Sequence, residues 1–274
     1  MSTTLIDHEL LQQFRRDGFV VKRGLFSSNE VQRYVEHFMA LRAAGSHPGD
    51  MAGVDATDGD PLLKFPRMIH MHHWDQVSRD WLLDARLQEC LTTLTGVEPL
   101  AVQTMLYFKP PGARGQALHQ DQFYLRVKPG ECMAAWLALD RCDIENGCMQ
   151  MVPGSHNLPL LCTEAADTAI SFTDRKVPLG PGVKPVAVTM AAGDVLFFGG
   201  MMIHGSFPNS STNRFRRSLI GHYITALAKE VADYYHPVLR FDGSEVKMTD
   251  SPQGGPCGVW VDRAGKPVVE LQHT

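Results

Sequence analysis

From about residue 99 to 228 the sequence consists of short apolar or alternating runs separated by Gly, Pro and Asn. The clearest runs cover 101–108, 133–139, 149–152, 186–190, 195–198 and 218–224. Short runs with such turn signals between them are typical of the strands of a β sandwich or barrel. No helical pattern alternates with them, which argues against a parallel βαβ sheet. We therefore predict a mainly β fold for this stretch.

Helical patterns precede the β stretch. Asp7 can cap a helix that ends at Gly18 in the left-handed conformation. Ser27 and Glu30 fit a capping box at the start of a second amphipathic helix that reaches Gly45. Both helices are expected to pack outside the β core.

A third helix is predicted from about Asp75 or Ser78 to Thr95. The segment 46–61 is rich in Gly, Asp, Ala and Pro, so we predict a surface loop there that can cover a site. We find no linker-like segment. We therefore predict a single domain over 1–274, with a helical part over about 1–98, a β core over about 99–228 and a C-terminal extension over about 229–274.

Composition narrows the possible functions. The 274 residues are 44% apolar and carry a net charge of -4, so they can form a core but offer no general attraction to nucleic acid or anionic lipid. With no leader-like segment or long apolar run, we expect a cytoplasmic monomer or homodimer without nucleic-acid or membrane partners. The six cysteines include no C-x-x-C pair, and we expect reduced, mostly buried thiols.

The pattern His-x-Asp occurs twice and can place an imidazole and a carboxylate on one face of a strand. With twelve histidines in the chain, roughly one occurrence is expected by chance. In His73-Trp74-Asp75 the aspartate is readily explained as a helix cap. His119-Gln120-Asp121 follows an apolar strand and a turn, a context typical of a barrel rim, and is the better candidate for a metal site.

A facial triad of two histidines and a carboxylate needs a third ligand. The candidates are His156, His204, His222 and His236, and His204 fits best because it follows a turn and a strand that enters the core. Such a triad suits Fe(II) with a 2-oxo acid, and an arginine can hold the distant carboxylate of that acid through paired hydrogen bonds. From the residues alone, an iron site, structural histidines and a different metal all remain open.

Several ordered motifs resemble the phytanoyl-CoA dioxygenase family of Fe(II)/2-oxoglutarate oxygenases, from about residue 8 to about 225. The motifs are Asp17-Gly18-Phe19-Val20-Val21, Thr104-Met105-Leu106, Lys109-Pro110-Pro111, Leu118-His119-Gln120-Asp121, Trp136, Glu145-Asn146-Gly147-Cys148, Pro153-Gly154-Ser155-His156, Gly193-Asp194, His204-Gly205-Ser206 and Phe215-Arg216. The resemblance implies a double-stranded β-helix, a cupin-like jelly roll, with flanking N-terminal helices.

The resemblance also implies the site. His119, Asp121 and His204 would be the catalytic iron ligands, with 2-oxoglutarate and O₂ as cosubstrates and ascorbate as a supportive reductant. Arg216 would hold the distant carboxylate of 2-oxoglutarate. If Arg216 points inward, strand parity leaves Arg214 as its only close rival, because Arg217 then faces away.

Further cosubstrate contacts follow from the same resemblance. Met105, Gln120 and Trp136 match family positions near 2-oxoglutarate, and Gln103 and Ser206 are added by strand parity and by adjacency to His204. A lysine that contacts the cosubstrate in the phytanoyl enzyme has no clear counterpart, because that part of the sequence is Lys64-Phe65-Pro66-Arg67-Met68-Ile69-His70.

The implied function is a dioxygenase that hydroxylates or otherwise oxidises a C–H bond of a small metabolite. The presence of Asp121 favours this reaction over halogenation. The substrate is expected to be anionic, such as an acyl-CoA, a phosphonate or a natural-product intermediate, if a basic mouth forms; its residues would be Lys64, Arg67, His70, Arg126 and Lys128. These residues are equally well explained as a solvated face. The alternatives are a non-catalytic jelly-roll binding protein and a zinc hydrolase on the same ligands.

Overall fold

A computed structural model describes residues 5–272. The helices are α1 (His8–Asp17), α2 (Ser28–Ala44), α3 (Pro61–Lys64), α4 (Gln76–Leu82), α5 (Ala85–Thr95) and α6 (Gln122–Leu125), and the short 3₁₀ helices are η1 (Met71–His73), η2 (Ser155–Asn157) and η3 (Asp233–Tyr235). The longer strands are β1 (Phe19–Lys22), β3 (Pro99–Tyr107), β4 (Gln116–His119), β5 (Cys132–Ala138), β10 (Val195–Gly199), β12 (Ser218–Thr225), β17 (Cys257–Arg263) and β18 (Lys266–Gln272). The shorter strands are β2 (Met68–Ile69), β6 (Met149–Met151), β7 (Glu164–Ala165), β8 (Arg175–Lys176), β9 (Val186–Val188), β11 (His204–Ser206), β13 (Glu230–Val231), β14 (Val238–Leu239), β15 (Glu245–Val246) and β16 (Thr249–Asp250).

The N-terminal helices begin and end at the predicted signals. The side chain of Asp7 accepts a hydrogen bond from the amide of Leu10, and Gly18 ends α1 with a φ of 84°. The reciprocal capping box of Ser27 and Glu30 is present at the start of α2. These signals are local in the sequence, which is why they could be located correctly.

The single helix predicted to end at Thr95 is wrong, because two helices occupy that segment. Helix α4 ends at Leu82, and Asp84 then caps α5 through the amide of Arg86. An aspartate cap in the middle of an otherwise periodic apolar pattern therefore restarts the helix in a new direction.

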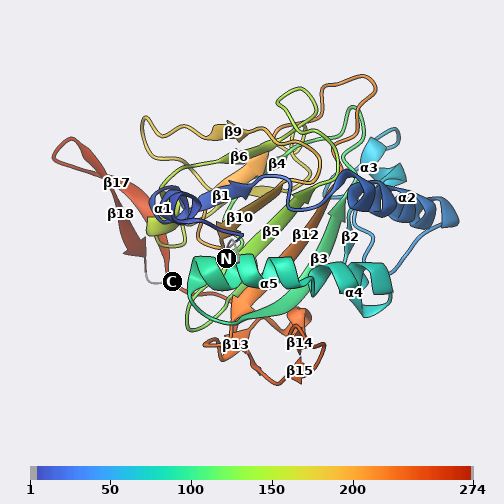
Figure 1. Ribbon diagram of the computed structural model, residues 1–274. Helices are drawn as coiled ribbons and strands as arrows, with labels where there is room; N and C mark the ends of the chain where they lie inside the picture. The colour runs from blue at the N-terminus through green and yellow to red at the C-terminus, as the bar shows by residue number, and fades with distance from the viewer. Residues whose placement is uncertain (1–4, 273–274) are drawn as a thin grey trace.

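Two facing sheets form the core, and three two-stranded sheets (β7-β8, β13-β16 and β17-β18) lie outside them. The large sheet has the order β1-β10-β5-β12-β3-β14-β15 with β2 beside β3, and the small sheet has the order β4-β11-β6-β9. Figure 1 shows α4 and α5 lying across the large sheet, with β4, β6 and β9 on the other side of the fold. This arrangement is the double-stranded β-helix, and the predicted fold class is confirmed.

Alternation along the strands separates two apolar layers. In β12, Leu219 packs into the cluster shared with α4 and α5, whereas the next residue, Ile220, packs into the cluster between the sheets. The inter-sheet cluster also holds Trp136 from β5 and Met149 from β6. The helices therefore cover one face of the large sheet, and the other face is free to line a cavity between the sheets.

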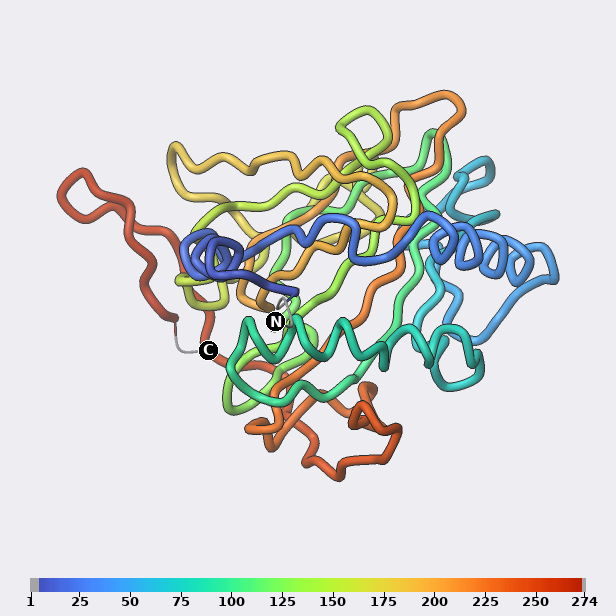
Figure 2. The backbone as a smooth tube through the Cα atoms, in the orientation of Figure 1, coloured from blue at the N-terminus to red at the C-terminus, as the bar shows by residue number. Residues whose placement is uncertain are grey.

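The C-terminal extension ends in a hairpin of β17 and β18 that stands away from the sheets (Figure 2). A parallel bridge between Leu161 and Gly258 brings Cys162 and Cys257 together, and they form a disulfide. The expectation of reduced thiols is wrong for this pair. The two cysteines are 95 residues apart in sequence, so only the fold makes them neighbours.

Cys90, Cys132, Cys142 and Cys148 are free and buried, as expected. Within residues 5–272, no helix combines the length and apolar character needed to cross a bilayer.

Candidate active site

Two histidines and one aspartate converge in the cavity between the sheets. His119 ends β4 and His204 begins β11, and the two residues are direct partners in the antiparallel register. Asp121 lies just after β4, with Oδ1 3.4 Å from Nε2 of His119 and Oδ2 3.6 Å from Nε2 of His204. All three residues are less than a tenth exposed. The fold therefore brings together the three predicted ligands, although 83 positions of sequence separate Asp121 from His204 (204 minus 121).

Backbone carbonyls orient both imidazoles of the triad. Nδ1 of His119 donates to the oxygen of Ala117 (2.9 Å), and Nδ1 of His204 donates to the oxygen of Met202 (3.0 Å). Each Nε2 then carries a lone pair that faces the centre of the triad. The side-chain amide of Gln116 donates to Nε2 of His119 (3.1 Å), which agrees with a ring protonated on Nδ1.

Burial and neighbouring groups set the charges of the triad. Burial lowers the pKa of His204 to about 4, so the ring is neutral near pH 7. Burial alone would raise the pKa of Asp121, but the neighbouring His204 and His222, together with the hydrogen bond from Nε2 of His222, hold it well below its usual value. Two neutral imidazoles and one carboxylate are the donor set of the iron facial triad.

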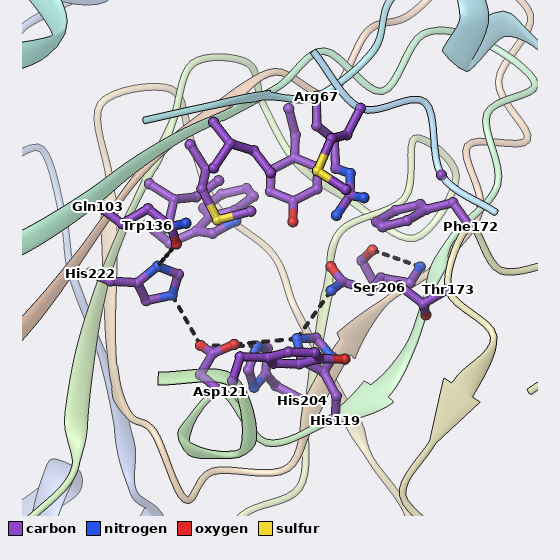
Figure 3. Close-up of a pocket in the computed structure, with 18 of the residues that line it drawn as sticks. Arg67, Gln103, His119, Asp121, Trp136, Phe172, Thr173, His204, Ser206 and His222 are labelled. Atoms are coloured by element: carbon purple, nitrogen blue, oxygen red, sulfur yellow. Dashed lines mark hydrogen bonds and ion pairs between the residues drawn. The ribbon is translucent and has the colours of Figure 1, made fainter. Parts of the chain in front are cut away.

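His222 on β12 supports the carboxylate without belonging to the triad. It donates through Nε2 to Oδ2 of Asp121 (3.2 Å), and its Nδ1 lies 2.8 Å from Oε1 of Gln103 on β3. Figure 3 shows this chain of contacts from Gln103 through His222 to Asp121. Sequence reasoning left the role of His222 open, although its parity with Ile220 placed it on the inner face.

Arg216 is buried in the same cavity. Its Nε donates to the oxygen of Gly147 (3.0 Å), its Nη1 donates to Oγ of Ser218 (2.9 Å), and its guanidinium lies over the Trp136 ring. It is 2% exposed, and no carboxylate within residues 5–272 forms an ion pair with it. A buried cation without an anion is expensive, so this position suits an acidic ligand.

The rival arginines are engaged elsewhere. Arg214 lies at the surface and forms ion pairs with Asp143 and Glu145, and Arg217 pairs with Asp140. Of the three arginines, only Arg216 lines the cavity.

Ser206 is positioned beside this arginine as a hydrogen-bond donor. Its Oγ accepts from Nζ of Lys109 (2.7 Å) and from the backbone N–H of Gln116 (3.2 Å), which leaves its own O–H free. Lys109 is buried behind the serine, and burial together with nearby Arg216 lowers its pKa. In the sequence, Lys109 stands out only as the first residue of Lys109-Pro110-Pro111.

Most of the predicted site residues share one cavity of about 660 Å³. Its walls include His119, Asp121, His204, Arg216, Ser206, Met105, Gln103 and Trp136. Gln120 is the exception, because it lies between two inward residues and its side chain points the other way. Its amide holds Pro159, Leu161 and Met201 by hydrogen bonds to their backbones, so the expected cosubstrate contact is wrong for this residue.

Other wall residues come from segments outside the predicted β core. Gly49 and Met51 of the predicted loop line the cavity, which agrees with a loop that covers a site, and backbone bonds tie it to β2 and to Phe172. Tyr234 and Tyr235 of the C-terminal extension complete the wall. No local motif marks these two tyrosines, so sequence reasoning missed them.

The other sequence candidates lie outside the triad. Asp75 caps α4, as predicted, and also contacts Nε2 of His37. His156 belongs to η2 and His236 lies 3.0 Å from Asp250.

Comparison with known proteins places the chain in a family. Residues 14–218 match the family described as phytanoyl-CoA dioxygenase (PhyH). The chain is 32% identical over 170 residues to a phytanoyl-CoA dioxygenase of Arabidopsis thaliana, covering 58% of this chain and 60% of that protein. It is 31% identical over 142 residues to phytanoyl-CoA dioxygenase 1 of Oryza sativa subsp. japonica, covering 52% of this chain and 50% of that protein. The chain thus spans half to three fifths of the length of these relatives.

A solved structure shares the fold. The epimerase SnoN, in complex with Fe3+, alpha ketoglutarate and nogalamycin RO, is 22% identical with a TM-score of 0.63 and covers 90% of this chain and 95% of its own. The family match spans helices α2 to α6, the whole small sheet, strands β1, β2, β3, β5 and β10 of the large sheet and all three triad residues. The chain therefore belongs to the phytanoyl-CoA dioxygenase family.

Proposed function

We propose that this protein is a 2-oxoglutarate-dependent non-haem iron dioxygenase that oxidises a C–H bond of a small anionic molecule. One observation carries the proposal: His119, His204 and Asp121 converge in the cavity that also contains Arg216, a buried arginine without an ion pair among residues 5–272. Zinc hydrolysis would use the same three ligands, but it gives no role to Arg216.

The donor set fits Fe(II). His119 and His204 present lone pairs on Nε2, and their Nδ1–H groups are held by backbone carbonyls, which is the usual support of a metal-bound histidine. Bound iron would supply adjacent positions for the 2-oxo acid and O₂ and the oxidising chemistry that couples their reaction to the substrate. SnoN, which shares the fold, binds Fe3+ and alpha ketoglutarate.

The residues around Arg216 suit the distant carboxylate of 2-oxoglutarate. The guanidinium supplies charge and donors, Ser206 supplies a free O–H, and the face of Trp136 covers the guanidinium. These groups would orient the cosubstrate and keep water from it. The chain thus contributes geometry and water exclusion, while the cofactors carry the oxidation.

The proposed anionic substrate rests on Arg67. This residue lines the cavity wall across from the triad (Figure 3). Its guanidinium lies 4.5 Å from the centre of the Phe172 ring, its Nε is buried without a partner, and no ion pair within residues 5–272 neutralises it. A carboxylate, phosphate or sulfate on the substrate would satisfy this charge and place the opposite end near the triad.

The activity is tested by screening anionic metabolites and their neutral esters or amides with Fe(II), 2-oxoglutarate, ascorbate and O₂. We expect succinate release and a product heavier by one oxygen for members of the anionic set, and neither with Asp121→Ala. If no compound accelerates succinate release and the protein binds neither Fe(II) nor 2-oxoglutarate, the proposal is wrong.

The role of Arg67 has its own test. Arg67→Gln should raise the KM for an anionic substrate about 10- to 100-fold, the loss of one charge-assisted contact, and leave the KM for 2-oxoglutarate unchanged. The KM of Arg67→Lys for the anionic substrate should lie between the values of the wild type and Arg67→Gln. If the KM for 2-oxoglutarate rises instead, Arg67 binds the cosubstrate and the substrate need not be anionic.

A further inference from the structure

Three histidines form a second cluster on η1 and the residue before it. One ring nitrogen from each of His70, His72 and His73 lies within 4.8 Å of the others, and the group contains no carboxylate or thiolate. It is separate from the triad, whose ligands come from β4, β11 and the residue after β4. We propose that this cluster is a second metal site, selective for a divalent ion that prefers nitrogen ligands, with Zn²⁺ as its representative.

Unpartnered nitrogen atoms inside the cluster are the main support. His72 is 2% exposed, and its Nε2 is buried without a hydrogen-bond partner; Nδ1 of His70 is buried and unpartnered as well. Leaving such groups unsatisfied is destabilising, so a buried pair calls for a ligand. His73 is exposed and opens the cluster to solvent, which gives an ion a route of entry.

The backbone holds the cluster in place before any ion binds. The amide of His70 donates to the oxygen of Thr104, and the amide of His72 donates to Oγ1 of the same threonine (3.1 Å). Nδ1 of His72 also lies 3.0 Å from that hydroxyl, the second contact that usually orients a metal-bound imidazole. His70 has a φ of 58°, a left-handed conformation that persists only where its surroundings require it.

The imidazoles are also in the protonation state that a metal requires. Burial lowers the pKa of His70 to about 4 and that of His72 to about 3, and burial with nearby Arg79 lowers the pKa of His73. His70 and His72 are therefore neutral at pH 7. A set of three neutral imidazoles favours zinc, copper or nickel over magnesium, calcium or manganese, which prefer oxygen.

The second site is connected to the triad through one amide. Nε2 of Gln103 lies 3.3 Å from Nε2 of His70, and Oε1 of Gln103 lies 2.8 Å from Nδ1 of His222, whose Nε2 contacts Asp121. A metal on Nδ1 of His70 requires a proton on Nε2, which a half-turn of the Gln103 amide would accept on oxygen. Occupancy of the second site would therefore fix the orientation of Gln103 beside His222.

Zinc stoichiometry tests the proposal on chelator-treated protein, measured by equilibrium dialysis with metal analysis. The double variant Asp121→Ala/His204→Ala removes the triad and should still bind one equivalent of Zn²⁺. Adding His73→Ala should weaken that equivalent at least tenfold. Adding His8→Ala instead, an exposed histidine on α1, should leave it unchanged.

Circular dichroism and thermal unfolding establish that the variants fold, and the Co²⁺ absorption spectrum reports nitrogen ligation independently. The proposal is overturned if the folded double variant binds no zinc, or if its zinc affinity does not depend on His73. Because the triad is absent from these variants, failure of the proposed dioxygenase activity would leave their result unchanged.

Discussion

Nε2 of His222 lies 3.2 Å from Oδ2 of Asp121, so a residue that is not a member of the triad holds the only carboxylate of the triad. His222 is itself fixed by Gln103, its direct partner in the register between β12 and β3. The orientation of a carboxylate just after β4 thus depends on a pair of strands in the opposite sheet.

Removing this support should weaken metal binding without removing a ligand. His222→Ala is expected to reduce Fe(II) affinity about 10- to 100-fold, the usual effect of losing such a contact, and to increase 2-oxoglutarate consumption without substrate oxidation. His222→Gln keeps a hydrogen-bond donor and should recover part of the Fe(II) affinity and part of the coupling to substrate oxidation. The measurements are anaerobic Fe(II) titration and the ratio of succinate to product; equal effects of Ala and Gln would indicate a purely structural role.

Replacing Arg216 with lysine should weaken only the binding of the cosubstrate. Arg216→Lys keeps the charge but loses paired hydrogen bonding, so the KM for 2-oxoglutarate is expected to rise about 10- to 100-fold. Arg214→Lys is the matched control and should change nothing, because Arg214 is paired with Asp143 at the surface. An unchanged KM in Arg216→Lys would remove Arg216 from the proposed cosubstrate site.

Adding a methyl group at Gly205 should push apart β4 and β11, the strands that carry His119 and His204. A Cβ at Gly205 would lie 2.7 Å from the backbone oxygen of Gln116, between β11 and β4. Gly205→Ala should therefore shift His204 relative to His119 and weaken metal binding about 10- to 100-fold. Far-ultraviolet circular dichroism should remain native. Metal affinity equal to that of the wild type would mean that the two strands tolerate the shift.

The acid stability of the helical layer should depend on Glu30. The hydrogen bond from Arg86 is the largest cause that lowers the pKa of Glu30, from 4.5 to about 2. Because the folded pKa lies below the unfolded one, this contribution is full above about pH 4.5 and is lost as the pH falls through about 2. Solvent screening at this partly exposed pair limits it to about 1 kcal/mol.

Glu30→Gln keeps the capping geometry but removes the charge. Denaturant unfolding from pH 7 to pH 2 should show the variant less stable at pH 7 and converging with the wild type at low pH. A difference that stays constant with pH would show that the ion pair does not contribute.

Much of the fold and the triad could be predicted because their signals are local or alternate along strands. Asp7, Gly18 and the Ser27–Glu30 box act within one helical turn, so the ends of α1 and α2 followed from the sequence. The spacing of His119 and Asp121 reflects strand parity. The same parity turns Gln120 away, a consequence that the family resemblance obscured.

The rest depends on long-range geometry. The disulfide of Cys162 with Cys257 and the position of Tyr235 in the cavity wall both require the C-terminal extension to fold back on the barrel. The break at Asp84 competes with an unbroken apolar pattern, and only packing against the large sheet decides between one helix and two. No spacing rule in the sequence contains this information.

The cavity is built from two kinds of segment. His119 and His204 stand on paired strands, whereas Met51 and Thr173 belong to connecting loops. Insertions and exchanges in such loops cost little stability, whereas changes in the strands cost much. Substrate choice can therefore diverge while the proposed oxidation chemistry stays fixed, and loop grafting is the natural route to redirecting this scaffold.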